Sequence, residues 1–126
     1  MSLSEHPIPE WRHKVFIGYV VLMVLVFLLP VPSTPLEESK YVDKAVHFGI
    51  FLGFALLFYI DRHWRAWWTL LISAAFAGGI ELVQSILPYR EGDWLDFAAG
   101  VAGAGVGAVL VLVIGRQLRH RAGAAR

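Results

Sequence analysis

The sequence contains no cysteine and few charged residues. The lack of cysteine excludes disulfide bonds, thiolate metal ligands, a cysteine nucleophile and lipid attachment to cysteine. Charged residues make up 17% of the 126 residues, against about 25% in an ordinary soluble domain. Hydrophobic residues make up 57%, and the mean hydropathy is +0.59. These values argue against a soluble globule and against disorder, and they indicate a membrane protein of one domain.

Four apolar segments approach the length that crosses a bilayer as a helix, about 20 residues. The expected spans are residues 14–30, 43–60, 66–87 and 94–115. The sequence thus predicts an all-α, polytopic membrane protein whose four transmembrane helices form a compact bundle over residues 1–126, with a basic tail at 116–126. The first span also has the basic residues and apolar run of a signal peptide. No A-x-A-like cleavage site follows it, so we expect it to remain in the protein.

The distribution of lysine and arginine predicts the orientation in the membrane. Two of these residues precede the first span, two lie between the second and third, and four follow the fourth, against three in the other two connections. Both termini are therefore predicted to be cytoplasmic. Arginines directly after a span are typical of a topology signal that also touches anionic lipid, so we expect no nucleic-acid partner.

Polar residues at membrane depth collect near the outer ends of the predicted helices. Asp43 and His47 are four residues apart, while Glu81 and Gln84, like Asp93 and Asp96, are three apart, so each pair shares one helix face. We expect eight side chains to converge there and refer to them as the polar cluster: Asp43, Lys44, His47, Glu81, Gln84, Arg90, Asp93 and Asp96.

Two interpretations of the polar cluster stay open. A carboxylate as deep as Glu81 costs several kcal/mol unless it is neutral, paired or hydrated, and ionisable groups inside membranes are functional by default. The alternative is a structural lock, in which Glu81 bonds His47 or Arg90 and fixes the packing of the helices.

Glycine faces predict close helix contacts. Gly103 and Gly107 form one small-xxx-small pair, and Gly49 and Gly53 form another. These pairs favour a tight bundle of the second, third and fourth spans, and they could also support a homo-oligomer.

At these motifs the sequence resembles the VanZ-like family, small multi-spanning bacterial membrane proteins named for a teicoplanin-resistance factor. The resemblance rests on DKAVHF at 43–48 and ELVQ at 81–84, followed by four single residues: Arg90, Asp96, Gly103 and Gly107. This chain has Gly100 where the family usually has Asn, so a role that needs an amide there does not carry over.

The resemblance implies a protein of the bacterial envelope, in the cytoplasmic (inner) membrane, that could lower susceptibility to glycopeptide antibiotics. It implies no established reaction. The sequence suggests a site that binds or handles an amphipathic ligand, either a membrane lipid or a lipid-linked envelope precursor. Lys44 and Arg90 suit phosphate or carboxylate groups, whereas the acids suit amines or hydroxyls.

Other functions are compatible with the same residues. In an intramembrane enzyme acting on a lipid headgroup, Glu81 would be the general acid and His47 the base. The sequence contains no Ser nucleophile motif, H-E-x-x-H or phosphate loop to support one. A small carrier or a structural membrane partner is a further alternative. No cofactor is expected, and a single histidine in the cluster gives little reason to expect a metal.

Overall fold

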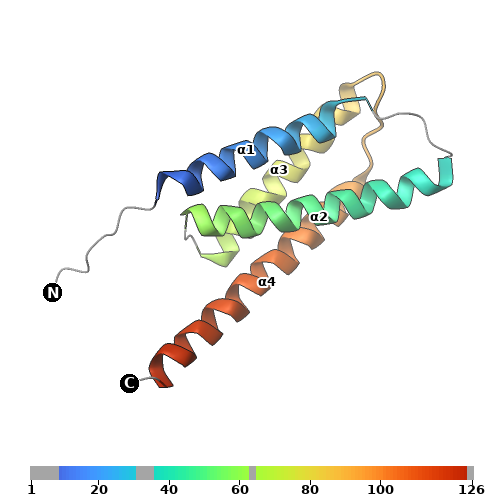
Figure 1. The fold of residues 1–126 in the computed structure, drawn as a ribbon. Helices are drawn as coiled ribbons and strands as arrows, with labels where there is room; N and C mark the ends of the chain where they lie inside the picture. The colour runs from blue at the N-terminus through green and yellow to red at the C-terminus, as the bar shows by residue number, and fades with distance from the viewer. Residues whose placement is uncertain (1–8, 31–35, 63–64, 125–126) are drawn as a thin grey trace.

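The computed structural model describes residues 9–30, 36–62 and 65–124. Each expected span is a helix: α1 (Glu10–Leu28), α2 (Leu36–Arg62), α3 (Ala66–Ile86) and α4 (Trp94–Ala124) (Figure 1). All four helices are long and apolar enough to cross a membrane, and no strand occurs within the described ranges. The predicted all-α, multi-spanning class is therefore confirmed.

Two helices are longer than the spans expected from the sequence. Helix α2 begins at Leu36 rather than near Asp43, and α4 continues past Arg116 to Ala124. Arg121 falls in the last turn of α4. A basic residue at this position complements the helix dipole and favours continuation of α4 beyond its apolar segment.

The bundle has one end where α1 and α3 finish and α2 and α4 begin, which we refer to as the polar end (Figure 1). The start of α1 and the finish of α4 lie at the opposite end, where the last part of α4 diverges from the other helices. The residues of α4 after Val111 are almost all exposed. The packed core is therefore built by the remaining length of the four helices.

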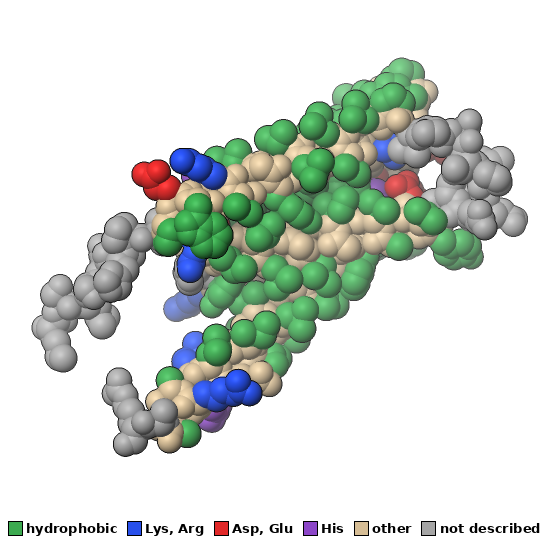
Figure 2. Space-filling view, in the orientation of Figure 1, with side chains coloured by type: hydrophobic (Ala, Val, Ile, Leu, Met, Phe, Trp, Pro, Cys, Tyr) green, Lys and Arg blue, Asp and Glu red, His purple; other side chains and the backbone are tan. Residues whose placement is uncertain are grey.

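Phenylalanines fill the core between α1, α2 and α3. Phe27 stacks on Phe51 with ring centroids 5.8 Å apart, and Phe54 stacks on Phe58 at 6.0 Å. All four are buried, together with Met23. The outward faces carry exposed aliphatic and aromatic side chains, with charge gathered at the two ends (Figure 2). This arrangement is the one expected of a bundle surrounded by lipid.

Glycine brings the backbones of α2 and α4 into direct contact. A Cβ at Gly103 would overlap the carbonyl oxygen of Phe48, and one at Gly107 would lie 2.9 Å from the Cβ of Ala55. The expected tight packing of these helices is confirmed. Gly49 has no neighbour within 4 Å of its Cβ position, so a homo-oligomer through exposed glycine stays a prediction.

Candidate functional site

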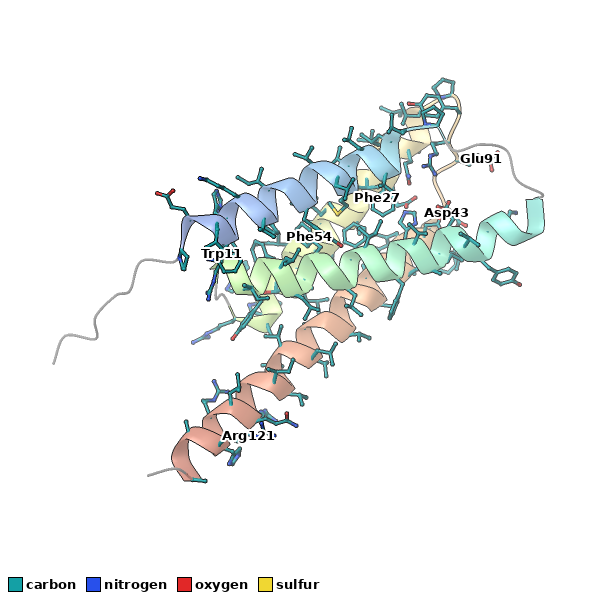
Figure 3. The ribbon with its side chains drawn as sticks, viewed as in Figure 1. Trp11, Phe27, Asp43, Phe54, Glu91 and Arg121 are labelled. Carbon is teal, nitrogen blue, oxygen red and sulfur yellow. The ribbon has the colours of Figure 1, made fainter. Side chains whose placement is uncertain are left out.

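The polar cluster lies at the polar end of the bundle (Figure 3). Asp43 and Glu91 mark this end, whereas Trp11 and Arg121 mark the opposite one. Helix α2 contributes three members of the cluster, α3 contributes two, and the α3–α4 connection with the first turn of α4 contributes three. Contacts link every member to another helix or to another member, as follows.

Lys44 joins α2 to the start of α4. Its Nζ donates hydrogen bonds to Oδ2 of Asp93 at 2.8 Å and to Oδ1 of Asp96 at 3.1 Å. The other oxygen of Asp93 accepts the Leu95 backbone N–H at 2.9 Å and so caps α4. The hydrogen bond from Lys44, followed by this cap, holds the pKa of the Asp93 carboxyl below its ordinary value. The positive charge of Lys44 is thus compensated by these two aspartates within the protein.

His47 is buried beneath α1, with 1% of its surface exposed. Its ring stacks on Phe27 with centroids 4.4 Å apart. Nδ1 lies 2.9 Å from the backbone carbonyl oxygen of Asp43. Because a carbonyl can only accept, Nδ1 carries the proton and donates it. The free nitrogen, Nε2, therefore points away from α2.

Nε2 of His47 points toward Glu81 of α3. It lies 3.0 Å from Oε1 of Glu81, but the two atoms are not aligned for a hydrogen bond. Neither atom has a hydrogen-bond partner in the part of the chain that the structure describes. The other oxygen of Glu81 accepts the backbone N–H of Asp93 at 3.0 Å. One oxygen of the Glu81 carboxylate therefore accepts a hydrogen bond, and the other faces His47 without one.

Asp43 and Asp96 close the cluster on the side of α2 and α4. Oδ1 of Asp43 lies 3.9 Å from Nδ1 of His47 and 3.9 Å from NH1 of Arg90. Asp96 is only 4% exposed. One ligand atom from each of Asp43, His47 and Asp96 lies within 4.8 Å of the other two. The residues expected to be neighbours are therefore brought together.

Gln84 and Arg90 contact the end of α1. Gln84 Nε2 donates to the Phe27 carbonyl at 2.8 Å, and Arg90 NH2 lies 3.2 Å from the carbonyls of both Val26 and Leu29. The last carbonyls of a helix have no partner within it, and leaving them bare in an apolar setting is costly. These two members of the cluster therefore fix α1 over the site.

Two features of the structure were not predicted from the sequence. Tyr89 also donates to the end of α1, at the Leu28 carbonyl, 3.0 Å away. At the opposite end, Asp61 is 4% exposed and lies 3.2 Å from Nδ1 of His13 and 3.1 Å from Nε of Arg62. An acid beside an arginine at a span boundary is an ordinary interface pattern. No signal in the sequence distinguished Asp61 from an exposed residue.

Four apolar helices with buried ionisable side chains at one end define a multi-pass membrane protein with an intramembrane polar site. A family model described as VanZ/LLP1 matches residues 15–115, which include the whole polar cluster. The chain therefore belongs to the VanZ/LLP1 family, and the resemblance seen in its motifs is confirmed. No curated protein and no solved structure matches it significantly.

Proposed function

We propose that this VanZ-family protein lies in the bacterial cytoplasmic (inner) membrane and binds the headgroup of an amphipathic envelope ligand at the polar cluster. The ligand class is a membrane lipid or a lipid-linked envelope precursor. Binding at this site would lower susceptibility to glycopeptides. By the distribution of basic residues, the polar end faces outward, where such precursors are used.

The main support is the burial of ionisable side chains at one end of an apolar bundle. His47, Asp96 and Glu81 are largely withdrawn from solvent, although each such group in a membrane is costly. Locking the helices together does not require this many acids, because Gln84 and Arg90 already hold α1. The oxygen of Glu81 that faces His47 has no hydrogen-bond partner among the described residues, so it is available for a ligand.

The contacts also favour one part of a headgroup. Lys44 is engaged by two aspartates, and Arg90 is engaged by α1 and lies near Asp43. The acids outnumber these two cations. The cluster is therefore better suited to amine or hydroxyl groups than to a bare phosphate.

Binding of a lipid-linked cell-wall precursor to the full chain in lipid nanodiscs tests this proposal. We expect saturable binding by the wild type and binding weakened about tenfold or more, or about 1.4 kcal/mol, in Glu81→Gln. Glu10→Gln is the matched control, because Glu10 is 90% exposed at the opposite end. Equal binding by all three proteins, or no binding by the wild type, would contradict the proposal.

Two alternative functions give different results in the same material. Turnover of the precursor to a new product, detected by mass spectrometry, would identify an acid–base enzyme. The 3.0 Å approach of His47 to Glu81 is the observation that favours this alternative. Protein-dependent flux of the precursor across proteoliposomes would identify a carrier. Binding without either reaction supports the proposed function.

A further inference from the structure

The polar cluster has more negative than positive groups. Asp43, Glu81, Asp93 and Asp96 supply four carboxylates, and Lys44 and Arg90 supply two cations. Two negative charges are left over when His47 is neutral. Lys40 and Glu91 at the rim are both exposed and opposite in sign, so they leave this balance unchanged. Uncompensated charge in a poorly solvated site is costly, which favours either a bound cation or a proton on one of these groups.

Three possible metal ligands of the cluster lie close together, and Glu81 lies beside one of them. Single ligand atoms of Asp43, His47 and Asp96 lie within 4.8 Å of one another. Two donors on one tetrahedral zinc ion, each about 2.0–2.1 Å from it, lie roughly 3.3–3.4 Å apart. Nε2 of His47 and Oε1 of Glu81 are already 3.0 Å apart.

His47 is held as a metal-binding histidine usually is. Its Nδ1 donates to the Asp43 carbonyl, which fixes the ring and leaves Nε2 as the basic nitrogen. The His47 side chain is 1% exposed, and its Nε2 atom has no hydrogen-bond partner among the described residues. Oε1 of Glu81 is likewise without one. Two buried acceptors that face each other repel unless a positive species lies between or beside them.

We propose that Asp43, His47 and Asp96, with Glu81 as a fourth ligand, bind one divalent transition-metal cation at the polar end of the bundle.

The donor set indicates which cations fit. One imidazole with several carboxylates suits Zn²⁺ or Mn²⁺, whereas Mg²⁺ and Ca²⁺ take oxygen ligands. Lys44 bonds one oxygen of Asp96, so it competes for this carboxylate without using both of its oxygens. The ammonium and the ion then lie on different sides of the same group.

The metal site adds to the proposed function, and only its role in binding a headgroup rests on that function. Lys44 and Arg90 are paired within the protein, so neither offers an open cationic site to a phosphate. Four protein ligands would leave an octahedral ion such as Mn²⁺ two coordination positions for hydroxyl oxygens of a headgroup. Binding of the cation itself requires no envelope ligand.

The test uses the full chain in detergent, treated with a chelator and titrated with Mn²⁺ alone while electron paramagnetic resonance follows the free ion. We expect one site per chain. His47→Gln and Asp96→Asn should each weaken binding by about 100-fold or more, because loss of a group that only orients a ligand already costs about 10- to 100-fold. His120→Gln is the matched control, because His120 is exposed near the far end of α4, and it should bind as the wild type does.

A measurement on the wild type alone guards against variants that fail to fold. Pulsed resonance of bound Mn²⁺ should show coupling to one imidazole nitrogen. Absence of that coupling, or equal affinity in wild type and a folded His47→Gln, would overturn the metal site. If Mn²⁺ binds as expected but the lipid-linked precursor does not, the metal site stands and the proposed function fails. If the precursor binds but Mn²⁺ does not, the proposed function stands and the metal site fails.

Discussion

Single side chains of the polar cluster divide by what they contact. Gln84 and Arg90 donate to backbone carbonyls at the end of α1, and their work is structural. Lys44 ties the start of α4 to α2. Within the part of the chain that the structure describes, His47 and Glu81 present buried polar atoms to each other without a formed hydrogen bond. A ligand that binds at this pair would therefore supply hydrogen bonds that the protein itself does not form.

Glu81→Gln should impair function more than folding. The amide keeps the shape of the side chain and an oxygen that can accept the backbone N–H of Asp93, now 3.0 Å away, but it removes the charge. We expect binding of the precursor and glycopeptide tolerance in a sensitised strain to fall, with the melting temperature nearly unchanged. Glu81→Leu leaves that N–H without its acceptor and should cost about 1–3 kcal/mol of stability. Full function of Glu81→Gln in both assays would reduce Glu81 to a packing lock.

Gln84→Leu should destabilise the protein through α1. Gln84 is buried and donates to the Phe27 carbonyl at 2.8 Å, so leucine leaves a buried acceptor without its partner. The expected loss is about 1–3 kcal/mol, measured by denaturant unfolding in detergent. Ser85→Ala is the control, since Ser85 is exposed and bonds only a carbonyl of its own helix. Equal stability of the two variants would show that α1 does not depend on this contact.

At the scale of the helices, glycine sets the distance between α2 and α4. Gly103→Ala should destabilise the bundle by about 1–3 kcal/mol, because its Cβ would overlap the Phe48 carbonyl. Gly105→Ala on the same helix has no atom within 4 Å of its Cβ, so it should be neutral or gain up to about 1 kcal/mol in helix propensity. Unfolding of both variants in one detergent compares them directly. A Gly103→Ala protein as stable as Gly105→Ala would mean that the helices are not in direct backbone contact.

The helices and the common level of the cluster could be predicted because they depend on local patterns. Span length follows from apolar runs, and the spacing of Asp43 and His47 places them on one face. The rotation of α1 could not be predicted, because a helix that is apolar all round gives no sign of which face packs inward. The contacts of Gln84 and Arg90 with α1 depend on that rotation. The burial of Asp61 depends on where His13 of α1 lies, and was missed for the same reason.

At the scale of the molecule, the two ends differ in their charges. The polar end carries excess acid among buried side chains, and the opposite end carries the arginines of α4 with the buried Asp61. On the face shown in Figure 2, charged groups are nearly absent from the apolar surface between them. A bilayer can therefore enclose the middle of the bundle while both ends reach the interfaces. The side on which each end lies decides which ligands can reach the polar cluster.

The orientation of the bundle is the prediction on which the ligand class depends. Reporter fusions after Lys40 and Pro88 should read as outside the cytoplasm, and fusions after His63 and Arg126 as inside. The reason is the excess of arginine and lysine in the segments at the end where α1 begins and α4 finishes. An enzyme active only outside the cytoplasm, paired with a fluorescent protein that matures only inside, gives a positive signal for each side. If the Arg126 fusion reads as outside, the polar cluster would open to the cytoplasm. Its ligand would then be a lipid of the inner leaflet, and an extracellular glycopeptide could not reach the site.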